Sequence, residues 1–239
     1  MSVDMSKNRD ITSRQAPTAP SIRSDVEAFL AEAGRIAPAA GARGRLIFAL
    51  DATMSRQPTW DLACGLQAEM FDAAGAVGGL QVQLVYFRGI GESRASAFVA
   101  NAAALGDLMV KIDCRGGHTQ IGKVLAHVRR EVGKRPVAAL AYVGDAMEEN
   151  PDQLCHLAGE IGLLGVRAFM FHEGRDKAAE RTFREIARLT GGAYLPFDRS
   201  SAAELRALLN AVATYAAGGL KALEQSKDGA RLLLPHMKQ

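Results

Sequence analysis

The sequence has 239 residues, of which 48% are hydrophobic and 23% are charged, as is typical of a globular protein in water. The formal net charge is only +3 and the basic residues are scattered, which argues against a nucleic-acid-binding surface. The three cysteines lack Cys-x-x-Cys spacing, and an odd, unpatterned set favours a reduced, cytoplasmic location over secretion.

The N-terminal part of the chain is predicted to lie outside the main domain. Residues 1–21 are rich in Ser, Thr, Pro and charged side chains, which predicts a disordered leader without the apolar core of a signal peptide. Ser24 and Glu27 form a capping box, so residues 22–44 are predicted to hold a short helix and a small-residue linker. No later stretch reaches the roughly 18 apolar residues of a membrane span, and we expect a soluble protein without membrane contact.

Six apolar stretches of the remaining sequence are predicted to be strands. The run from Leu46 to Leu50 is uninterrupted, as expected of a strand buried on both faces of a parallel sheet. The third stretch follows the second after a tight turn, which predicts an antiparallel hairpin, and Pro196 places the last strand at an edge. The predicted strands cover residues 46–50, 80–87, 93–99, 136–143, 166–171 and 193–197.

Helical patterns separate most of these strands. They begin near residues 58, 102, 121, 151, 178 and 202. Alternating strands and helices indicate right-handed crossovers, so residues 45–217 are predicted to form one α/β domain. We expect a doubly wound, Rossmann-like arrangement with a mostly parallel central sheet of about six strands, helices on both faces and one antiparallel edge strand. Residues 218–239 are predicted to be a separate C-terminal tail.

Oxygen-bearing side chains gather at the ends of these elements. Asp51, Thr53 and Ser55 follow the first strand, Thr119 precedes a helix, and Asp145 follows the fourth strand. The first and fourth strands should be neighbours where the strand order reverses, which is where ligands bind in such sheets. Two carboxylates and three hydroxyls form an oxygen-only ligand set, which suits Mg²⁺ or Mn²⁺.

Each of these residues also has a purely structural interpretation. Asp51 could cap the following helix, Thr119 could cap its own helix, and Asp145 could be a turn residue. Three acids follow Asp145, namely Glu148, Glu149 and Asp152. They could extend an acidic rim of the site, but a solvated helix start favoured by the helix dipole is the preferred interpretation. His172 and Glu173 are expected to be exposed loop residues after the fifth strand. His118 is left with two alternatives, contact with a ligand or a role in its loop.

The site residues resemble a known motif, the metal ion-dependent adhesion site of von Willebrand factor A domains. That motif reads Asp-x-Ser-x-Ser, a distant Thr and a distant Asp, and the resemblance covers about residues 45–217. This chain departs from it at three places: Thr53 replaces a serine, His118 replaces a glycine of Gly-Gly-Thr-x-x-Gly, and Gly144-Asp145-Ala146 replaces Thr-Asp-Gly. Thr53 keeps the hydroxyl, whereas His118 could narrow the pocket and Ala146 changes the third loop.

The resemblance implies a binding module rather than an enzyme. In the family, an acidic side chain of a protein partner completes the metal shell, and intracellular members often work in assemblies with an ATPase or a chaperone. Two alternatives stay open: a Mg²⁺-dependent hydrolase or phosphotransferase that uses Asp51 and Asp145, and a metal-free scaffold. The absence of a second aspartate two residues after Asp51, and of a lysine in either loop, argues against the enzyme.

Overall fold

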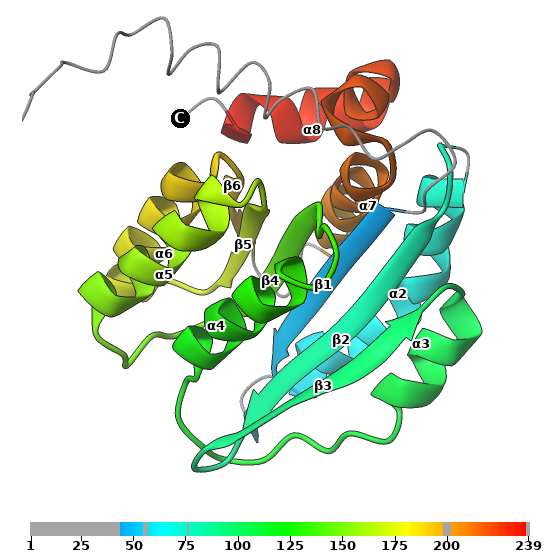
Figure 1. The fold of residues 1–239 in the computed structure, drawn as a ribbon. Helices are drawn as coiled ribbons and strands as arrows, with labels where there is room; N and C mark the ends of the chain where they lie inside the picture. Colours follow the sequence, from blue (N-terminus) through cyan, green and yellow to red (C-terminus); the bar gives the residue numbers. More distant parts are fainter. Residues whose placement is uncertain (1–43, 55–56, 76, 198–201, 238–239) are drawn as a thin grey trace, which may run out of the picture. The chain divides into compact units, whose positions relative to one another are not determined.

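A computed structural model describes residues 44–54, 57–75, 77–197 and 202–237. The predicted leader and the predicted helix near residues 24–36 lie outside these ranges. The described chain builds one six-stranded sheet in the order β3-β2-β1-β4-β5-β6 (Figure 1). The strands are β1 (Gly44–Asp51), β2 (Leu80–Arg88), β3 (Glu92–Val99), β4 (Ala139–Gly144), β5 (Arg167–Glu173) and β6 (Ala193–Phe197).

The strand directions confirm the predicted doubly wound topology. β1 is parallel to β2 on one side and to β4 on the other, and β5 and β6 continue the parallel series. Only β3 runs antiparallel, paired with β2 as a hairpin. Both edges are as expected, with β3 antiparallel at one edge and Pro196 in the strand at the other.

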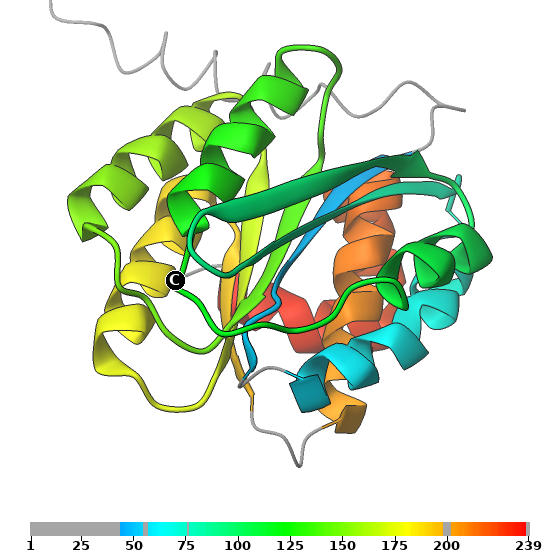
Figure 2. The ribbon, with the colours of Figure 1, turned by 90° about the horizontal axis from the view of Figure 1, so that it is seen from below.

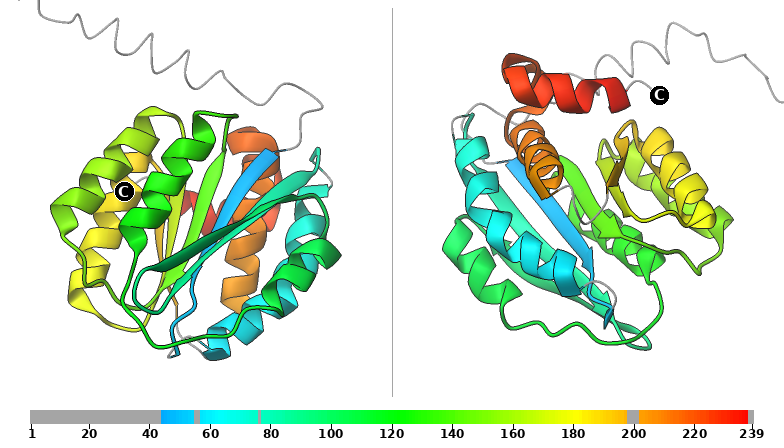
Figure 3. Two further views of the ribbon diagram at one scale, coloured as in Figure 1. Left: turned by 60° about the horizontal axis from the view of Figure 1, so that its bottom comes forward. Right: turned by 180° about the vertical axis from the view of Figure 1, so that it is seen from behind.

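Helices cover both faces of the sheet (Figures 2 and 3). Alternate residues of β1 separate the two cores, because successive strand side chains point to opposite faces. Leu46, Phe48 and Leu50 pack with α2, α3, α7 and α8, whereas Ile47 and Ala49 pack with α4, α5 and α6. The helices are α2 (Gln57–Gly75), α3 (Ala102–Met109), α4 (Ile121–Val132), α5 (Pro151–Leu163), α6 (Lys177–Thr190), α7 (Ala202–Gln225) and α8 (Lys227–Met237).

The C-terminal residues join the first of these cores. The predicted tail boundary at residue 217 falls inside α7, which bends at Gly219 with φ 69° and ψ −164°. α8 then packs against α7 and the edge strand β6. Leu223 and Leu233 are fully buried in the core, so residues after the bend contribute to the same hydrophobic core as β1. Within the described ranges, no helix combines the length and the apolar character that crossing a membrane requires.

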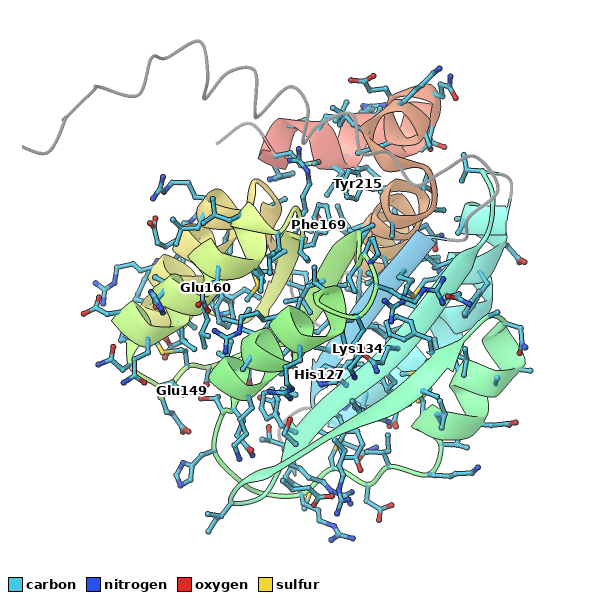
Figure 4. All side chains as sticks on the ribbon, viewed as in Figure 1. His127, Lys134, Glu149, Glu160, Phe169 and Tyr215 are labelled. Carbon is cyan, nitrogen blue, oxygen red and sulfur yellow. The ribbon has the colours of Figure 1, made fainter. Side chains whose placement is uncertain are left out.

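His127 of α4 lies between this helix and the sheet. Its Nε2 atom lies 2.9 Å from Gln83 Oε1 of β2, and Figure 4 labels it between α4 and the sheet. Burial lowers the pKa of His127 below its ordinary value, and Arg130 and Lys134 add to this effect while Glu131 opposes it.

The lowered pKa predicts how stability depends on pH. The unfolded chain protonates His127 near its ordinary pKa of about 6.5, while the folded chain resists protonation. The contribution of neutral His127 to the free energy of unfolding is therefore complete above about pH 6.5. It is lost as the pH falls from there towards the pKa of His127 in the folded protein. Urea unfolding between pH 7.5 and 5.5 should show a shallower decline for His127→Gln than for wild type. The exposed His156 gives the control variant His156→Gln, and an equal change in both variants would contradict the prediction.

Candidate metal site

The two site aspartates follow neighbouring strands, as the sequence predicts. Leu50 pairs with Val143 in the parallel ladder between β1 and β4. Asp51 is the last residue of β1, and Asp145 comes directly after Gly144, the last residue of β4. The strand order reverses at this pair, because β2 lies beyond β1 and β5 lies beyond β4. Ser55, the remaining predicted ligand on this loop, lies outside the described residues.

Asp51 turns the chain at the end of β1. Its side chain is buried, with 2% of the residue exposed, and its Oδ1 atom accepts a 2.8 Å hydrogen bond from the Thr53 amide. This bond forms a local turn of the kind that aspartate favours. This bond lies before α2, whose described part begins at Gln57. Thr53 is also buried, at 9% exposure.

The segment that carries Thr119 crosses the ends of β1 and β2. The Arg115 amide donates to the Ala52 carbonyl at 2.9 Å, and the His118 amide donates to the Gly89 carbonyl at 3.3 Å. Between these bonds, Gly117 approaches the β2–β3 turn so closely that a Cβ atom would lie 2.3 Å from the backbone nitrogen of Gly89. Glycine is required there because the two backbones touch. The segment is thereby fixed beside the strand that carries Asp51.

Thr119 is hydrogen-bonded to the loop that follows Asp145. Its hydroxyl accepts from the Glu148 amide at 3.1 Å, and its own amide donates to Glu148 Oε2 at 3.2 Å. His118 Nδ1 lies 3.0 Å from the same carboxylate oxygen, which supports its role in the loop. Thr119 does not cap α4, whose N-cap residue Gln120 makes no side-chain capping bond. The reciprocal bonds join the second and third site segments.

Glu149 provides the missing cap of α4. Its two carboxylate oxygens accept from the Ile121 and Gly122 amides at 2.5 and 2.8 Å, and Figure 4 labels it near the start of this helix. The expectation of a solvated residue at the start of α5 is therefore wrong for Glu149, whereas Glu148 is exposed, as expected, with 53% of its side chain accessible. The cap of α5 is Asn150, as Asn-Pro at a helix start indicates. A carboxylate at the N-terminus of α4 also interacts favourably with the helix dipole.

His172 supports Asp145 from inside the sheet. The expectation of an exposed loop is wrong, since His172 lies within β5 and is 1% exposed. Its Nε2 atom lies 3.3 Å from the Asp145 carbonyl oxygen, and its Nδ1 lies 2.8 Å from the Tyr194 hydroxyl. A carbonyl only accepts, so Nε2 carries the proton and Nδ1 accepts from tyrosine. Burial lowers the pKa of His172, which favours this neutral form.

Glu173 is also buried rather than exposed in a loop, with 5% of the residue accessible. Its carboxylate accepts a 2.5 Å hydrogen bond from the hydroxyl of Thr59 in the first turn of α2. The sequence offered one signal for both residues: they continue the apolar run of β5 without an intervening turn residue. Helices cover both faces of β5, and its last residues are polar because they lie at the edge of the sheet where the candidate site is.

The donor set fits a hard divalent cation. Within the described ranges, no group of three or more His, Cys, Asp or Glu side chains is arranged to hold a metal ion. The predicted ligand set differs in kind, because it combines two aspartates with hydroxyl oxygens. The Thr119 hydroxyl keeps a second lone pair after accepting from Glu148. Asp51 is a nearly inaccessible carboxylate, and a bound cation would offset the cost of burying its charge. Asp145 is half-buried and accessible from the same edge.

Comparisons with known proteins identify the fold. No family model and no curated protein matches the sequence. Among solved structures, the SpRpn10 VWA domain is 11% identical with a TM-score of 0.55, over 69% of this chain and 95% of that chain. Proximal thread matrix protein 1 from the mussel byssus, with a zinc-occupied MIDAS motif, is 16% identical with a TM-score of 0.54, over 73% and 46%. Manganese-loaded TRAP protein of Plasmodium vivax is 13% identical with a TM-score of 0.51, over 70% and 72%.

Proposed function

We propose that this protein, which has the von Willebrand factor A fold, is a module that binds other proteins through a divalent cation. The ion is Mg²⁺, or Mn²⁺, held by Asp51, Thr53, Ser55, Thr119 and Asp145. An acidic side chain of the partner completes the shell. The proposal does not involve nucleic acid or a membrane.

The observation that carries this proposal is the convergence of three chain segments at the β1–β4 reversal. Asp51 and Asp145 follow adjacent strands. The Thr119 segment is bonded to Ala52 on one side and to Glu148 on the other. Such an edge is where ligands bind in doubly wound sheets. Oxygen donors favour Mg²⁺ or Mn²⁺ over softer metals.

The chemistry of the cation explains why the partner group would be acidic. Mg²⁺ requires six oxygen ligands and retains water where protein ligands are too few. A carboxylate that replaces one water forms a direct charged contact with the ion. The cation would thus attract the partner's carboxylate. The residues of this chain would orient the ligand oxygens and determine from which side the carboxylate can reach the ion.

The setting in the cell is part of the proposal. The cysteine pattern favours the cytoplasm, and the fold-level analogy with intracellular domains of this kind points to a multiprotein assembly with an ATPase or chaperone.

A hydrolase built on the same site has less support. Its nearest buried base would be His172, but both ring nitrogens already have partners, Tyr194 and the Asp145 carbonyl. A general base needs a free nitrogen within reach of the proton that it removes. The contacts of His172 therefore favour a structural role, and with it a binding module over catalysis.

The test is cation-dependent capture of a partner. Immobilised protein should retain a specific partner from lysate in Mg²⁺, release it in EDTA and fail to retain it when Asp145 is replaced by alanine. Asp152→Ala is the matched control, because Asp152 is an exposed acid in the first turn of α5, the helix that follows this loop. Capture that survives EDTA and Asp145→Ala would favour the metal-free scaffold.

A further inference from the structure

A basic groove lies between α4 and the hairpin of β2 and β3, and none of its lining residues is a predicted metal ligand. Its volume is about 280 Å³, and its lining includes Lys123, His127 and Arg130 of α4 and Ser93, Arg94 and Ala95 of β3. The three α4 residues are spaced at i, i+4 and i+7, which places them along one side of the helix. The small side chains of Ser93 and Ala95 leave room beside β3 that a larger residue would fill.

The charge of this groove is not balanced by its own lining, which contains no acidic residue. Lys123 Nζ is held by two neutral acceptors, the Gly91 carbonyl at 2.8 Å and Gln120 Oε1 at 2.9 Å. The nearby acid Glu92 is bonded to Arg88 at 3.1 Å, and Glu131 is bonded to Arg45 and Lys134. Arg94 is itself paired with Glu92 at 3.5 Å, so the unbalanced positive charge of the groove comes from Lys123 and Arg130.

The strand beside the groove has an open edge. β3 spans eight residues and pairs only with β2 among the described strands, and its outermost position is visible in Figure 2. The opposite edge differs, because β6 has five residues, contains Pro196 and is contacted by α8. Proteins usually protect an edge with proline, charge or a covering element, since unpaired backbone groups accept another strand. β3 carries the charged residues Glu92 and Arg94 and a register irregularity opposite Gln83 and Val85, but it contains no proline, and Ala95 and Ala97 are exposed on it.

We propose that the open edge of β3, with the basic groove beside it, binds an extended acidic segment of another protein as an added strand. Backbone hydrogen bonds to β3 would supply affinity, and alternate side chains of the segment would fall on the groove side. Acidic side chains at those positions reach Lys123 and Arg130 across the small residues of β3. The site is separate from the metal site, so one protein can hold two acidic features of a partner.

A second copy of the same chain is the less suitable occupant. Antiparallel pairing of β3 with its own copy around a twofold axis would place two basic grooves next to each other on one face. Like charges in that arrangement repel. An acidic strand instead matches the charge of the groove.

The test uses a defined peptide in EDTA, which removes any contribution of the cation site. A fluorescein-labelled decapeptide of alternating Glu and Val should bind, measured by anisotropy, whereas the same peptide with Lys in place of Glu should not. Lys123→Gln/Arg130→Gln should weaken binding about three- to tenfold, since two exposed ion pairs are lost. The matched control is Arg129→Gln/Arg188→Gln, because neither arginine lines the groove. Arg129 pairs with Glu160 of α5, and Arg188 pairs with Glu185 within α6.

Hydrogen exchange then locates the peptide. Amides of residues 92–99 should become protected when the acidic peptide binds, because backbone pairing slows their exchange. Absence of peptide binding, equal weakening by the control pair, or binding without protection of β3 would each overturn the proposal. So would concentration-dependent dimerisation that protects the same amides, which would assign the edge to a second copy. None of these results depends on whether the metal site binds a cation.

Discussion

Replacing Asp51 by asparagine is expected to abolish the thermal stabilisation that Mn²⁺ or Mg²⁺ gives to the wild-type protein. A cation that binds only the folded state adds about 2.7 kcal/mol at a hundredfold excess over its Kd, which raises the Tm of a chain of this size by about 5–10 °C. Asparagine keeps the shape of the side chain but removes its charge, so the variant should fold and show no shift. The measurement is a melt in EDTA and then in excess metal.

The control for this melt is Asp113→Asn. Asp113 is an acid in the segment that carries Thr119, but its side chain is 79% exposed. If loss of a charge alone has no effect, the metal-induced rise in Tm of Asp113→Asn should equal that of wild type. If Asp51→Asn keeps the full metal shift, Asp51 is not a ligand; if wild type shows none at any accessible concentration, the metal-free scaffold becomes the better description.

Gly117→Ala is expected to lower the free energy of unfolding by about 1–3 kcal/mol, the usual cost of forcing an extra methyl into a packed position. The new Cβ would overlap backbone atoms of Gly89, with contacts of 2.3–2.5 Å, and backbone cannot rotate aside as a side chain can. The segment would have to leave the β2–β3 turn, and Thr119 would move with it. Urea unfolding and the metal-dependent melt measure the two effects.

The neighbouring glycine provides a control for Gly117→Ala. A Cβ at Gly116 meets no atom within 4 Å, so Gly116→Ala should leave both stability and the metal shift near wild-type values. Equal losses for the two variants would show that the loop needs glycine for its backbone freedom rather than for close approach to Gly89.

The strands and their order could be predicted because apolar runs report directly on burial. Leu46–Leu50 and the run that contains Leu140 and Val143 are continuous, which is how doubly covered parallel strands read. The antiparallel hairpin followed from its tight turn, and the neighbouring positions of Asp51 and Asp145 followed from topology. These features depend on the hydrophobic pattern of each segment and on the lengths of the connections between segments, and a single sequence contains both.

The contacts that hold the site together could not be predicted in this way. Glu149 caps a helix that begins 28 residues earlier in the chain, and sequence rules for capping consider only residues near the helix start. His172 and Glu173 are polar and precede Gly174, so they resemble loop residues, yet they belong to the strand. Their burial depends on partners from Tyr194 and Thr59, which only the folded chain brings close.

The bonds between Thr119 and Glu148 have a consequence for the entropy of metal capture. All three ligand-bearing segments are joined before any ion arrives, through Arg115 to Ala52 and through Thr119 to Glu148, and His172 also contacts the Asp145 carbonyl. Preorganised groups lose little freedom on binding. The entropy cost of ordering these segments is therefore largely met by folding, and breaking one of the bonds that join them should weaken cation binding even where no ligand is changed.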